Sequence, residues 1–391
     1  MIDLGALLHD LCAVTPDRRP GSAGNEAAVD LVAGVMTELG WPVQCPRFPV
    51  VDWEGSLGAL TMAGRSWPLH PSHYSLGWQG TAPVRTAATE AELAAPLTGC
   101  AVVLHGELAA TPLTPKGYPF YGSERDARII ERLESSGAVA VLAITGRSPE
   151  LAGSLDPFPL IEDGTFTLPT GNLREDDGAD LLDTVASTLG TSATIDLPAR
   201  RWPATARNVI AHRGDQSNRI TVVAHIDTKP GTPGAIDNGT GVVVLARVAE
   251  LLAGSPAGVE LLAVNGEDCY SASGELDYLA MTDLSQVRLA INIDGLGYRG
   301  GPSAYSTYGT PDDLDLTPLA GLEAGPQWPQ SDHMVFVGAG RPAIALTSSD
   351  FATVMNEIAH SPGDTPEVVD LDLVEQAAQA IAGLVRGSSL E

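Results

Sequence analysis

The second half of the chain alternates short apolar runs with segments of helical spacing, and this alternation restricts the possible folds more than any other feature. Strands that alternate with helices predict an α/β fold, with a mostly parallel mixed sheet sandwiched by helices. The predicted strands are Val209–Ala211, Ile220–Ala224, Val259–Val264, Leu289–Ile293 and Ala343–Leu346. The predicted helices are Gly241–Leu252, Gly274–Met281 and Leu371–Val385.

The first half of the chain has a different pattern. Helical spacing in the first forty residues gives way, after Trp41, to short β-like pieces with frequent Gly and Pro. The chain has 391 residues, and domains average roughly 150. We expect one domain from 1–45 and 200–391, interrupted by a β-rich insertion domain, 46–199. Its predicted elements are strands Ala101–Leu104, Ala138–Ile144 and Ala193–Leu197 and helices Arg125–Leu133 and Ala179–Leu189.

The chain is strongly acidic, with 22 Lys and Arg against 49 Asp and Glu and a formal net charge of −27. Nucleic acids and anionic membranes bind basic faces, so we expect neither as a partner. No apolar run approaches the roughly 18 residues of a membrane span. The N-terminus shows no signal peptide, so we expect a cytoplasmic protein, or a secreted one if a leader has been removed. The sequence gives no indication of oligomeric state.

Acidic residues and a histidine follow the predicted strands or precede the next helix. Because ligands gather at the carboxyl ends of strands in such sheets, these side chains should share one sheet edge. Carboxylates beside a histidine repel one another unless a cation neutralises them, and Zn²⁺ binds this mixture of donors. The residues are His225, Asp227, Asp237, Glu267, Asp268 and Asp294, joined by His360 near the C-terminus.

Each of these residues alone has a simpler explanation. An Asp at a strand end is more often a helix cap or part of an Asx turn, and Asp237 before Asn238-Gly239 suits that role. His225 alone could be a buried histidine with satisfied hydrogen bonds, and Glu267-Asp268 could be an acidic loop. Their ordered occurrence together favours a metal site, because independent loops seldom line up along one sheet edge.

These residues form motifs that resemble a known family. The motifs are His-x-Asp from 225, Asp-Asn-x-x-Gly from 237, Gly-Glu-Asp from 266, Asn-x-Asp from 292 and His-Ser-Pro-x-Asp-Thr from 360. Together they look like the co-catalytic di-zinc peptidases, the family of aminopeptidase Y, the glutamate carboxypeptidases and the glutaminyl cyclases. The resemblance covers about 1–45 and 200–391, including Arg18–Ser22 and Ser331–His333, and implies a phosphorylase/hydrolase-like zinc exopeptidase fold.

The resemblance also implies two zinc ions per chain. His225 and Asp294 would bind the first ion. Asp268 and His360 would bind the second, and Asp237 would bridge the two.

Two further carboxylates gain roles from the resemblance. Asp227 would orient the imidazole of His225. Glu267 would be the general base, which deprotonates the water that bridges the metals and returns the proton to the leaving amine. Two cations would lower the pKa of that water and stabilise the oxyanion.

Two positions depart from the family's pattern. The family usually has Glu-Glu at Glu267-Asp268, so the second ion has a shorter ligand here, and we expect it to be lost first. The family often has Tyr where this chain has Ala359, and its hydroxyl helps to stabilise the oxyanion. Either another donor replaces it, or the reaction is slower or different. The candidate donors are Tyr305, Tyr308 and His333, and Asp332 and His333 are candidate substrate-binding or supporting residues.

Part of the insertion resembles a protease-associated domain, a module that lies beside the active site in several peptidases and is thought to shape substrate access. The resemblance is carried by Leu97–Leu104, Ser136–Val141 and Leu168–Asn172. Gly-Ala-x-Ala-Val strands are common in α/β proteins, so a plain β-rich insertion is the alternative.

The leading functional hypothesis is a zinc aminopeptidase that acts on a peptide or aminoacyl amide. The alternatives are a glutaminyl-cyclase-like enzyme, a carboxypeptidase of the same family and a non-catalytic binding protein. A carboxypeptidase needs a cationic clamp, for which no Arg stands out, and a binding protein has no need of Glu267 as a proton shuttle. A serine hydrolase is disfavoured because the chain lacks a Gly-x-Ser-x-Gly motif.

Overall fold

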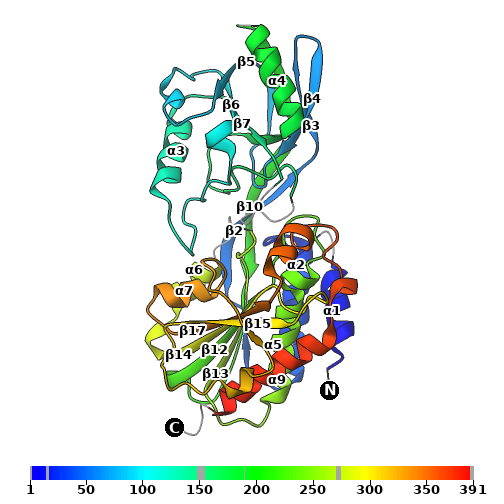
Figure 1. The fold of residues 1–391 in the computed structure, drawn as a ribbon, viewed down its shortest axis with the longest axis vertical. Helices are drawn as coiled ribbons and strands as arrows, with labels where there is room; N and C mark the ends of the chain where they lie inside the picture. Colours follow the sequence, from blue (N-terminus) through cyan, green and yellow to red (C-terminus); the bar gives the residue numbers. More distant parts are fainter. Residues whose placement is uncertain (1, 15–16, 148–154, 189, 270–273, 388–391) are drawn as a thin grey trace. The chain divides into compact units, whose positions relative to one another are not determined.

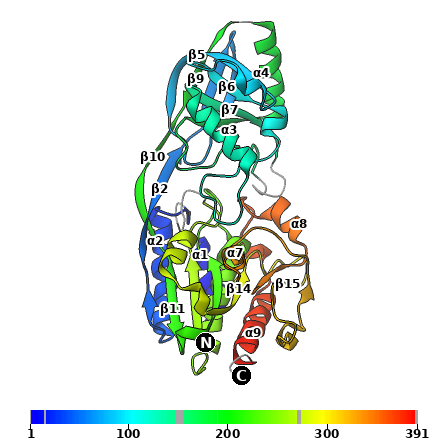
Figure 2. The ribbon, with the colours of Figure 1, turned by 90° about the vertical axis from the view of Figure 1, so that its left-hand side faces the viewer.

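The computed structural model describes residues 2–14, 17–147, 155–188, 190–269 and 274–387. The chain divides into two compact units. The sheet unit comprises Met1–Val50, Pro119–Tyr121 and Ala204–Glu391, and the barrel unit comprises Val51–Tyr118 and Gly122–Pro203. The chain leaves the sheet unit along β2 (Arg47–Gly55) and returns along β10 (Ala199–Arg207), and these two strands pair with each other (Figures 1 and 2).

Among the described residues, the sheet unit contains a mixed sheet of eight strands. In spatial order they are β1 (Val43–Gln44), β11 (Val209–Arg213), β13 (Val259–Val264), β12 (Arg219–His225), β14 (Val287–Ile293), β17 (Ala343–Ser348), β15 (Ser303–Tyr308) and β16 (Glu323–Ala324). The four central strands, from β13 to β17, are parallel, and antiparallel pairs flank them. Every residue of β12 and β13 is buried, which explains their continuous apolar sequences.

Helices cover both faces of this sheet (Figure 1). Four helices share one apolar core with the sheet: α1 (Leu4–Cys12), α2 (Ala23–Glu38), α5 (Thr240–Leu251) and α9 (Leu371–Gly387). Helices α6 (Gly274–Met281) and α7 (His333–Gly338) lie on the opposite face, where the rings of Tyr278 and Phe336 are 6.0 Å apart. The short helix α8 (Phe351–Thr353) follows β17. None of the described helices has both the length and the hydropathy needed to cross a membrane.

The predicted α/β fold is confirmed. The five predicted strands correspond to β11, β12, β13, β14 and β17, and the three predicted helices to α5, α6 and α9. Strand β15 was not predicted because Ser303–Tyr308 is rich in Ser, Thr and Tyr and lacks a long apolar run. Helix α7 was missed because it has only six residues.

The barrel unit contains a closed barrel of described strands. Their order around it is β3 (Gly58–Met62), β4 (Arg65–Pro71), β8 (Thr170–Arg174), β7 (Ala140–Thr145), β6 (Ala101–Leu104), β5 (Trp78–Ala87) and β9 (Ser192–Leu197). Helices α3 (Glu124–Ser135) and α4 (Glu175–Ser187) contribute Ile129, Leu133 and Leu181 to its two apolar cores. The predicted strands and helices of the insertion are confirmed. Closure was not predicted, because it depends on pairing between β3 and β9, which are distant in the sequence.

Candidate metal centre

Five of the predicted site residues meet at the carboxyl-terminal edge of the central strands. His225 is the last residue of β12, Asp294 directly follows β14, and Asp268 lies in the loop after β13. Asp237 lies in the short helical turn Ala235–Gly239 before α5, and His360 follows the turn Val354–Ile358. Parallel strands end together at this edge, so residues from distant parts of the sequence become neighbours.

Asp237 lies between the two histidines. Its Oδ1 is 3.1 Å from Nε2 of His225, and its Oδ2 is 2.9 Å from Nε2 of His360. Nε2 of His225 is also 3.5 Å from Oδ1 of Asp294, and Nε2 of His360 is 2.8 Å from Oδ1 of Asp268. The donors form group A (His225, Asp237 and Asp294) and group B (Asp237, Asp268 and His360), and within each group the ligand atoms lie within 4.8 Å of one another.

The electrostatics of both groups suit a cation. Burial alone would lower the pKa of His225, but the nearby Asp237 and Asp294 raise it well above its usual range. Asp268 and Asp237 likewise outweigh burial and raise the pKa of His360. Although burial opposes the effect, the two imidazoles hold the pKa of Asp237 well below its usual range. Without a metal, the carboxylates therefore favour the protonated form of both imidazoles.

The donor set fits Zn²⁺. It combines two imidazoles with three carboxylates, all in buried or half-buried positions. Nε2 of His225 is fully buried and forms no well-aligned hydrogen bond among the described residues, as expected of a nitrogen that binds a metal. Nδ1 of the same ring lies 3.2 Å from the backbone carbonyl of Asp227, so a proton on Nδ1 leaves Nε2 available.

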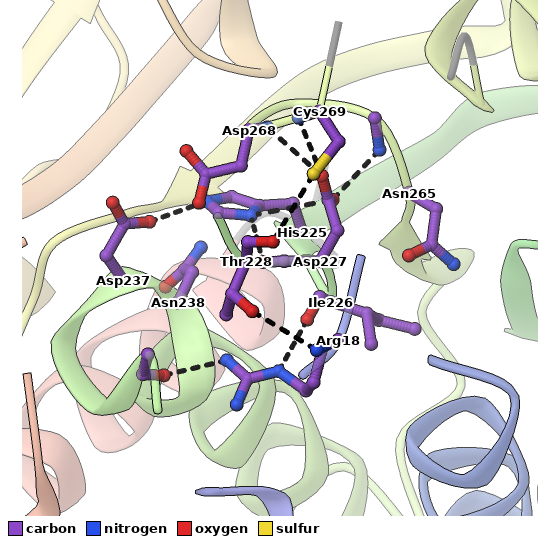
Figure 3. Close-up of polar contacts among 12 residues, drawn as sticks. Arg18, His225, Ile226, Asp227, Thr228, Asp237, Asn238, Asn265, Asp268 and Cys269 are labelled. Carbon is purple, nitrogen blue, oxygen red and sulfur yellow. Dashed lines mark hydrogen bonds and ion pairs between the residues drawn. The ribbon is translucent and has the colours of Figure 1, made fainter. Parts of the chain in front are cut away.

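The carboxylate of Asp227 contacts the backbone of the loop that carries Glu267 and Asp268. It accepts hydrogen bonds from the N–H groups of Gly266 (2.8 Å), Asp268 (3.1 Å) and Cys269 (3.1 Å), as Figure 3 shows. Its nearest oxygen is 3.7 Å from Nδ1 of His225. The backbone carbonyl of Asp227 is therefore closer to the imidazole than its carboxylate, which mainly fixes the loop.

Asp237 is held from two directions. The carboxylate of Asp364 accepts hydrogen bonds from the N–H groups of Ile236 (2.7 Å) and Asp237 (3.0 Å). The side chain of Asn238 donates to the carbonyl of Ile293 (2.7 Å), one residue before Asp294. Burial raises the pKa of Asp364 to about 7. Asp364 belongs to the His-Ser-Pro-x-Asp-Thr motif, so the motif supplies both His360 and this support.

Asp294 is supported by Ser331. The hydroxyl of Ser331 donates to Oδ2 of Asp294 at 2.6 Å and accepts a hydrogen bond from Nδ2 of Asn292 at 2.8 Å. Ser331 has a φ of 88°, an uncommon conformation for a residue with a side chain. The strained backbone at Ser331 therefore places this hydroxyl against the carboxylate of Asp294.

Glu267, the predicted general base, is a member of neither donor group. Its side chain is buried, and burial raises its pKa well above the usual range of a glutamate. The neighbouring carboxylates of Asp294 and Asp268 raise the pKa further. In the metal-free protein, burial and these carboxylates outweigh the opposing effect of His225 and favour the protonated form of Glu267.

Two of the three candidate oxyanion donors have their polar atoms engaged elsewhere. Burial lowers the pKa of His333 to about 4, and its neutral ring lies 3.3 Å from Nδ2 of Asn292 and 3.2 Å from the carbonyl of Trp328. The hydroxyl of Tyr308 bonds the N–H of Trp328 at 2.8 Å and its carbonyl at 3.1 Å. Tyr305 instead lines a hollow of about 230 Å³ together with Trp328 and Phe351.

Asp332 belongs to a buried acidic pair that sequence reasoning missed. Asp332 and Glu275 are 1% and 2% exposed, and apart from each other their carboxyl groups have no hydrogen-bond partner among the described residues. Burial raises the pKa of Asp332 to about 7 and that of Glu275 well above its usual range. No motif marked Glu275, because a glutamate in the first turn of a helix usually faces solvent.

The chain is similar to proteins that are named aminopeptidases. Over 313 residues the chain is 27% identical to the probable lipoprotein aminopeptidase LpqL of Mycobacterium tuberculosis, covering 76% of this chain and 58% of that protein. Over 396 residues it is 25% identical to aminopeptidase YwaD of Bacillus subtilis, covering 94% and 80%. The chain thus spans little more than half of one relative and four-fifths of the other.

A solved structure shares the fold. BSAP, described as a zinc aminopeptidase from Bacillus subtilis, superposes with a TM-score of 0.72 at 20% identity, covering 99% of this chain and 95% of that chain. Residues 208–385, which carry every ligand of groups A and B, match the profile of Peptidase family M28. The resemblance to this metallopeptidase family is therefore confirmed over residues 208–385.

Proposed function

We propose that this protein is a zinc aminopeptidase that binds two zinc ions. The observation that carries the proposal is Asp237, whose two carboxylate oxygens each face a different histidine. Group A would hold one ion and group B the other, with Asp237 shared between them. The names of LpqL and YwaD support an aminopeptidase activity.

The zinc ions, the general base and the residues that position them have separate roles in the proposed reaction. When bound, zinc supplies Lewis acidity that polarises the scissile carbonyl. Glu267 takes a proton from the attacking water and returns it to the leaving amine. Asp227 holds the backbone around Glu267, and Asp364 holds the backbone of Asp237, so both carboxylates are positioned before substrate binds.

The substrate is proposed to be a peptide or aminoacyl amide with a free N-terminus. The net charge of −27 favours a cationic amino group over an anionic C-terminus. We also propose that the barrel unit is the protease-associated-like insertion. Strand β6 lies within Leu97–Leu104, and strands β7 and β8 begin within Ser136–Val141 and Leu168–Asn172, the segments that carry that resemblance.

Metal analysis and a substrate panel test this proposal together. We expect two zinc ions per chain, and release of the first residue from aminoacyl amides but not from their N-acetylated forms. Stepwise chelation should remove the ion of group B first. At most one zinc ion after supplementation, together with cyclisation of N-terminal glutamine, would instead identify a cyclase. Release of C-terminal residues would identify a carboxypeptidase.

A further inference from the structure

Arg18 lies in the connector between α1 and α2, far in the sequence from every predicted ligand, yet it is only 1% exposed. Its guanidinium donates to backbone carbonyls: Nε to Ile226 (2.7 Å), Nη1 to Pro233 (2.7 Å) and Leu11 (3.2 Å), and Nη2 to Gly234 (2.7 Å). Burial of a charge is unfavourable unless hydrogen bonds compensate it. Four such bonds to one guanidinium therefore indicate a specific role for this position.

Three of these bonds join the two ends of the segment between His225 and Asp237. Ile226 directly follows His225, and Pro233 and Gly234 lie shortly before Asp237. The guanidinium is a rigid planar fork, so it holds these carbonyls at a fixed separation. Figure 3 shows Arg18 beneath this segment, with Ile226 on its Nε side and Asp237 and His225 above.

Gly234 shows how closely Arg18 approaches this segment. Its φ is 66°, and a Cβ at this position would lie 2.7 Å from Nη2 of Arg18 and 2.2 Å from Cγ2 of Thr228. A residue with a side chain would therefore displace the guanidinium or Thr228. The glycine and the arginine together define the conformation of the chain just before Asp237.

The backbone of Arg18 is also tied to the loops of the metal centre. Its N–H lies 3.3 Å from Oγ1 of Thr228, and its carbonyl accepts a hydrogen bond from Nδ2 of Asn25 at 2.7 Å. The same nitrogen of Asn25 lies 2.6 Å from Oδ1 of Asn265, which precedes Glu267 in the loop after β13. The connector thus contacts the loop after β12 directly and the loop after β13 through Asn25 of α2.

We propose that Arg18 is a positioning residue of the metal centre, which sets the separation between His225 and Asp237 by holding both ends of residues 226–234. This inference rests on the proposed zinc function. It assigns the connector between α1 and α2 to the metal centre, although none of the connector's described residues belongs to group A or group B.

Arg219 provides a matched control for a purely structural role. It is 3% exposed and is the first residue of β12, whereas His225 is the last. Its Nε lies 3.3 Å from Oε1 of Glu260, and its Nη1 donates to the carbonyl of Gln216 at 2.9 Å. Both arginines are therefore buried and hydrogen-bonded, but only Arg18 contacts the segment between two ligands.

The test compares Arg18→Lys with Arg219→Lys in the full chain. Zinc affinity is measured by competition with a chromophoric chelator, thermal unfolding by circular dichroism, and kcat and KM at saturating zinc. We expect Arg18→Lys to weaken zinc binding about 10–100-fold, the usual effect of losing support behind a metal ligand. Lysine cannot bridge the two ends of residues 226–234, so the variant should bind zinc more weakly. Excess zinc should refill the site, restoring kcat and leaving KM nearly unchanged. Arg219→Lys should lower the unfolding temperature without changing zinc affinity.

Three outcomes would overturn the proposal. The first is a folded Arg18→Lys protein with wild-type zinc affinity. The second is a loss of zinc affinity in Arg219→Lys that equals the loss in Arg18→Lys. If Arg18→Lys does not fold, Thr228→Val removes only the bond to the Arg18 N–H and should lower zinc affinity about two- to tenfold. An unchanged affinity in Thr228→Val is the third. Failure of the wild-type protein to bind zinc would instead refute the proposed function itself.

Discussion

Groups A and B share Asp237 but differ in what holds their other ligands. In group A, the imidazole of His225 contacts the Asp227 carbonyl, and Asp294 accepts a hydrogen bond from Ser331. In group B, Asp268 accepts a hydrogen bond from the N–H of Lys229 at 3.2 Å. Nδ1 of His360, however, has no hydrogen-bond partner among the described residues. Group A thus has support behind both of its own ligands, and group B behind only one.

This difference points to His360, and not to Asp268, as the reason to expect weaker zinc binding in group B. The sequence points to Asp268, whose side chain is one methylene shorter than the family's usual glutamate. In the structure Oδ1 of Asp268 nevertheless lies 2.8 Å from Nε2 of His360. The carboxylate of Asp227 accepts a hydrogen bond from the Asp268 N–H and so holds the backbone of the loop in this position. His360 instead has a strained φ of 57° and an imidazole without outer support. We therefore attribute the expected weakness to His360.

The largest expected effect comes from Glu267, which lies in neither group. Glu267→Gln preserves size and removes basicity, so turnover should fall about 10²–10⁴-fold while both metals remain bound. Steady-state kinetics and metal analysis of the same preparation measure the two quantities. Asp268→Ala is the matched variant, since it should lose metal from group B and regain part of its activity at high zinc. If Glu267→Gln loses metal and Asp268→Ala does not, the two roles are exchanged.

The two groups should behave alike toward pH. In the metal-free protein the carboxylates outweigh burial and raise the pKa of His225 and His360 well above the usual range, which favours the protonated form of both imidazoles. Zinc binds neutral imidazole, so filling both groups should release about two protons. Zinc affinity should then rise with pH by up to about tenfold per unit for each proton. Calorimetry in two buffers of different ionisation enthalpy measures the number of protons released when zinc binds. If no protons are released, the histidines do not form ion pairs with Asp237 in the metal-free protein.

The same ion pairs should make the metal-free fold sensitive to alkali. A raised histidine pKa contributes stability that is complete below the pKa of the unfolded chain, near 6.5, and is lost as pH rises through the raised value. Raising the pH should therefore destabilise the metal-free protein while it strengthens zinc binding. Thermal unfolding with and without zinc, from pH 6 upward, separates the two effects.

The central strands and the edge where the ligands meet could be predicted from the sequence, because strands buried on both faces are continuous apolar runs. His225 ends such a run, Asp294 directly follows one, and Asp268 lies in the loop after one, so the topology of the sheet brings them together. The supports of these ligands could not be predicted in the same way. Arg18 acts through contacts with segments that are distant in the sequence, and no local sequence pattern indicates which carbonyls surround a buried guanidinium.

Lengthening Asp268 distinguishes the two explanations for group B. If the short side chain limits zinc binding, Asp268→Glu should strengthen it. We expect the opposite, because the backbone is already held close by Asp227 and the longer side chain must be compressed. Overpacking of this kind costs about 1–3 kcal/mol, which corresponds to a loss of zinc affinity of at least about fivefold in group B. Tighter binding of the second zinc ion in Asp268→Glu would restore the explanation based on length.

The smallest expected effect comes from Ser331, which supports group A alone. Ser331→Ala removes the hydroxyl that donates to Asp294, while the positive φ is equally unfavourable for serine and alanine, so backbone strain is matched. The variant also removes the acceptor of the Asn292 side chain, but only the bond to Asp294 touches a ligand. Loss of that bond, about 0.5–1.5 kcal/mol, should weaken zinc binding in group A about two- to tenfold and narrow the difference in zinc affinity between the groups. Ser303→Ala is the control, because that buried hydroxyl has no hydrogen-bond partner among the described residues. Stepwise chelation measures both variants, and a Ser331→Ala protein that retains the wild-type difference would show that Asp294 needs no support from this hydroxyl.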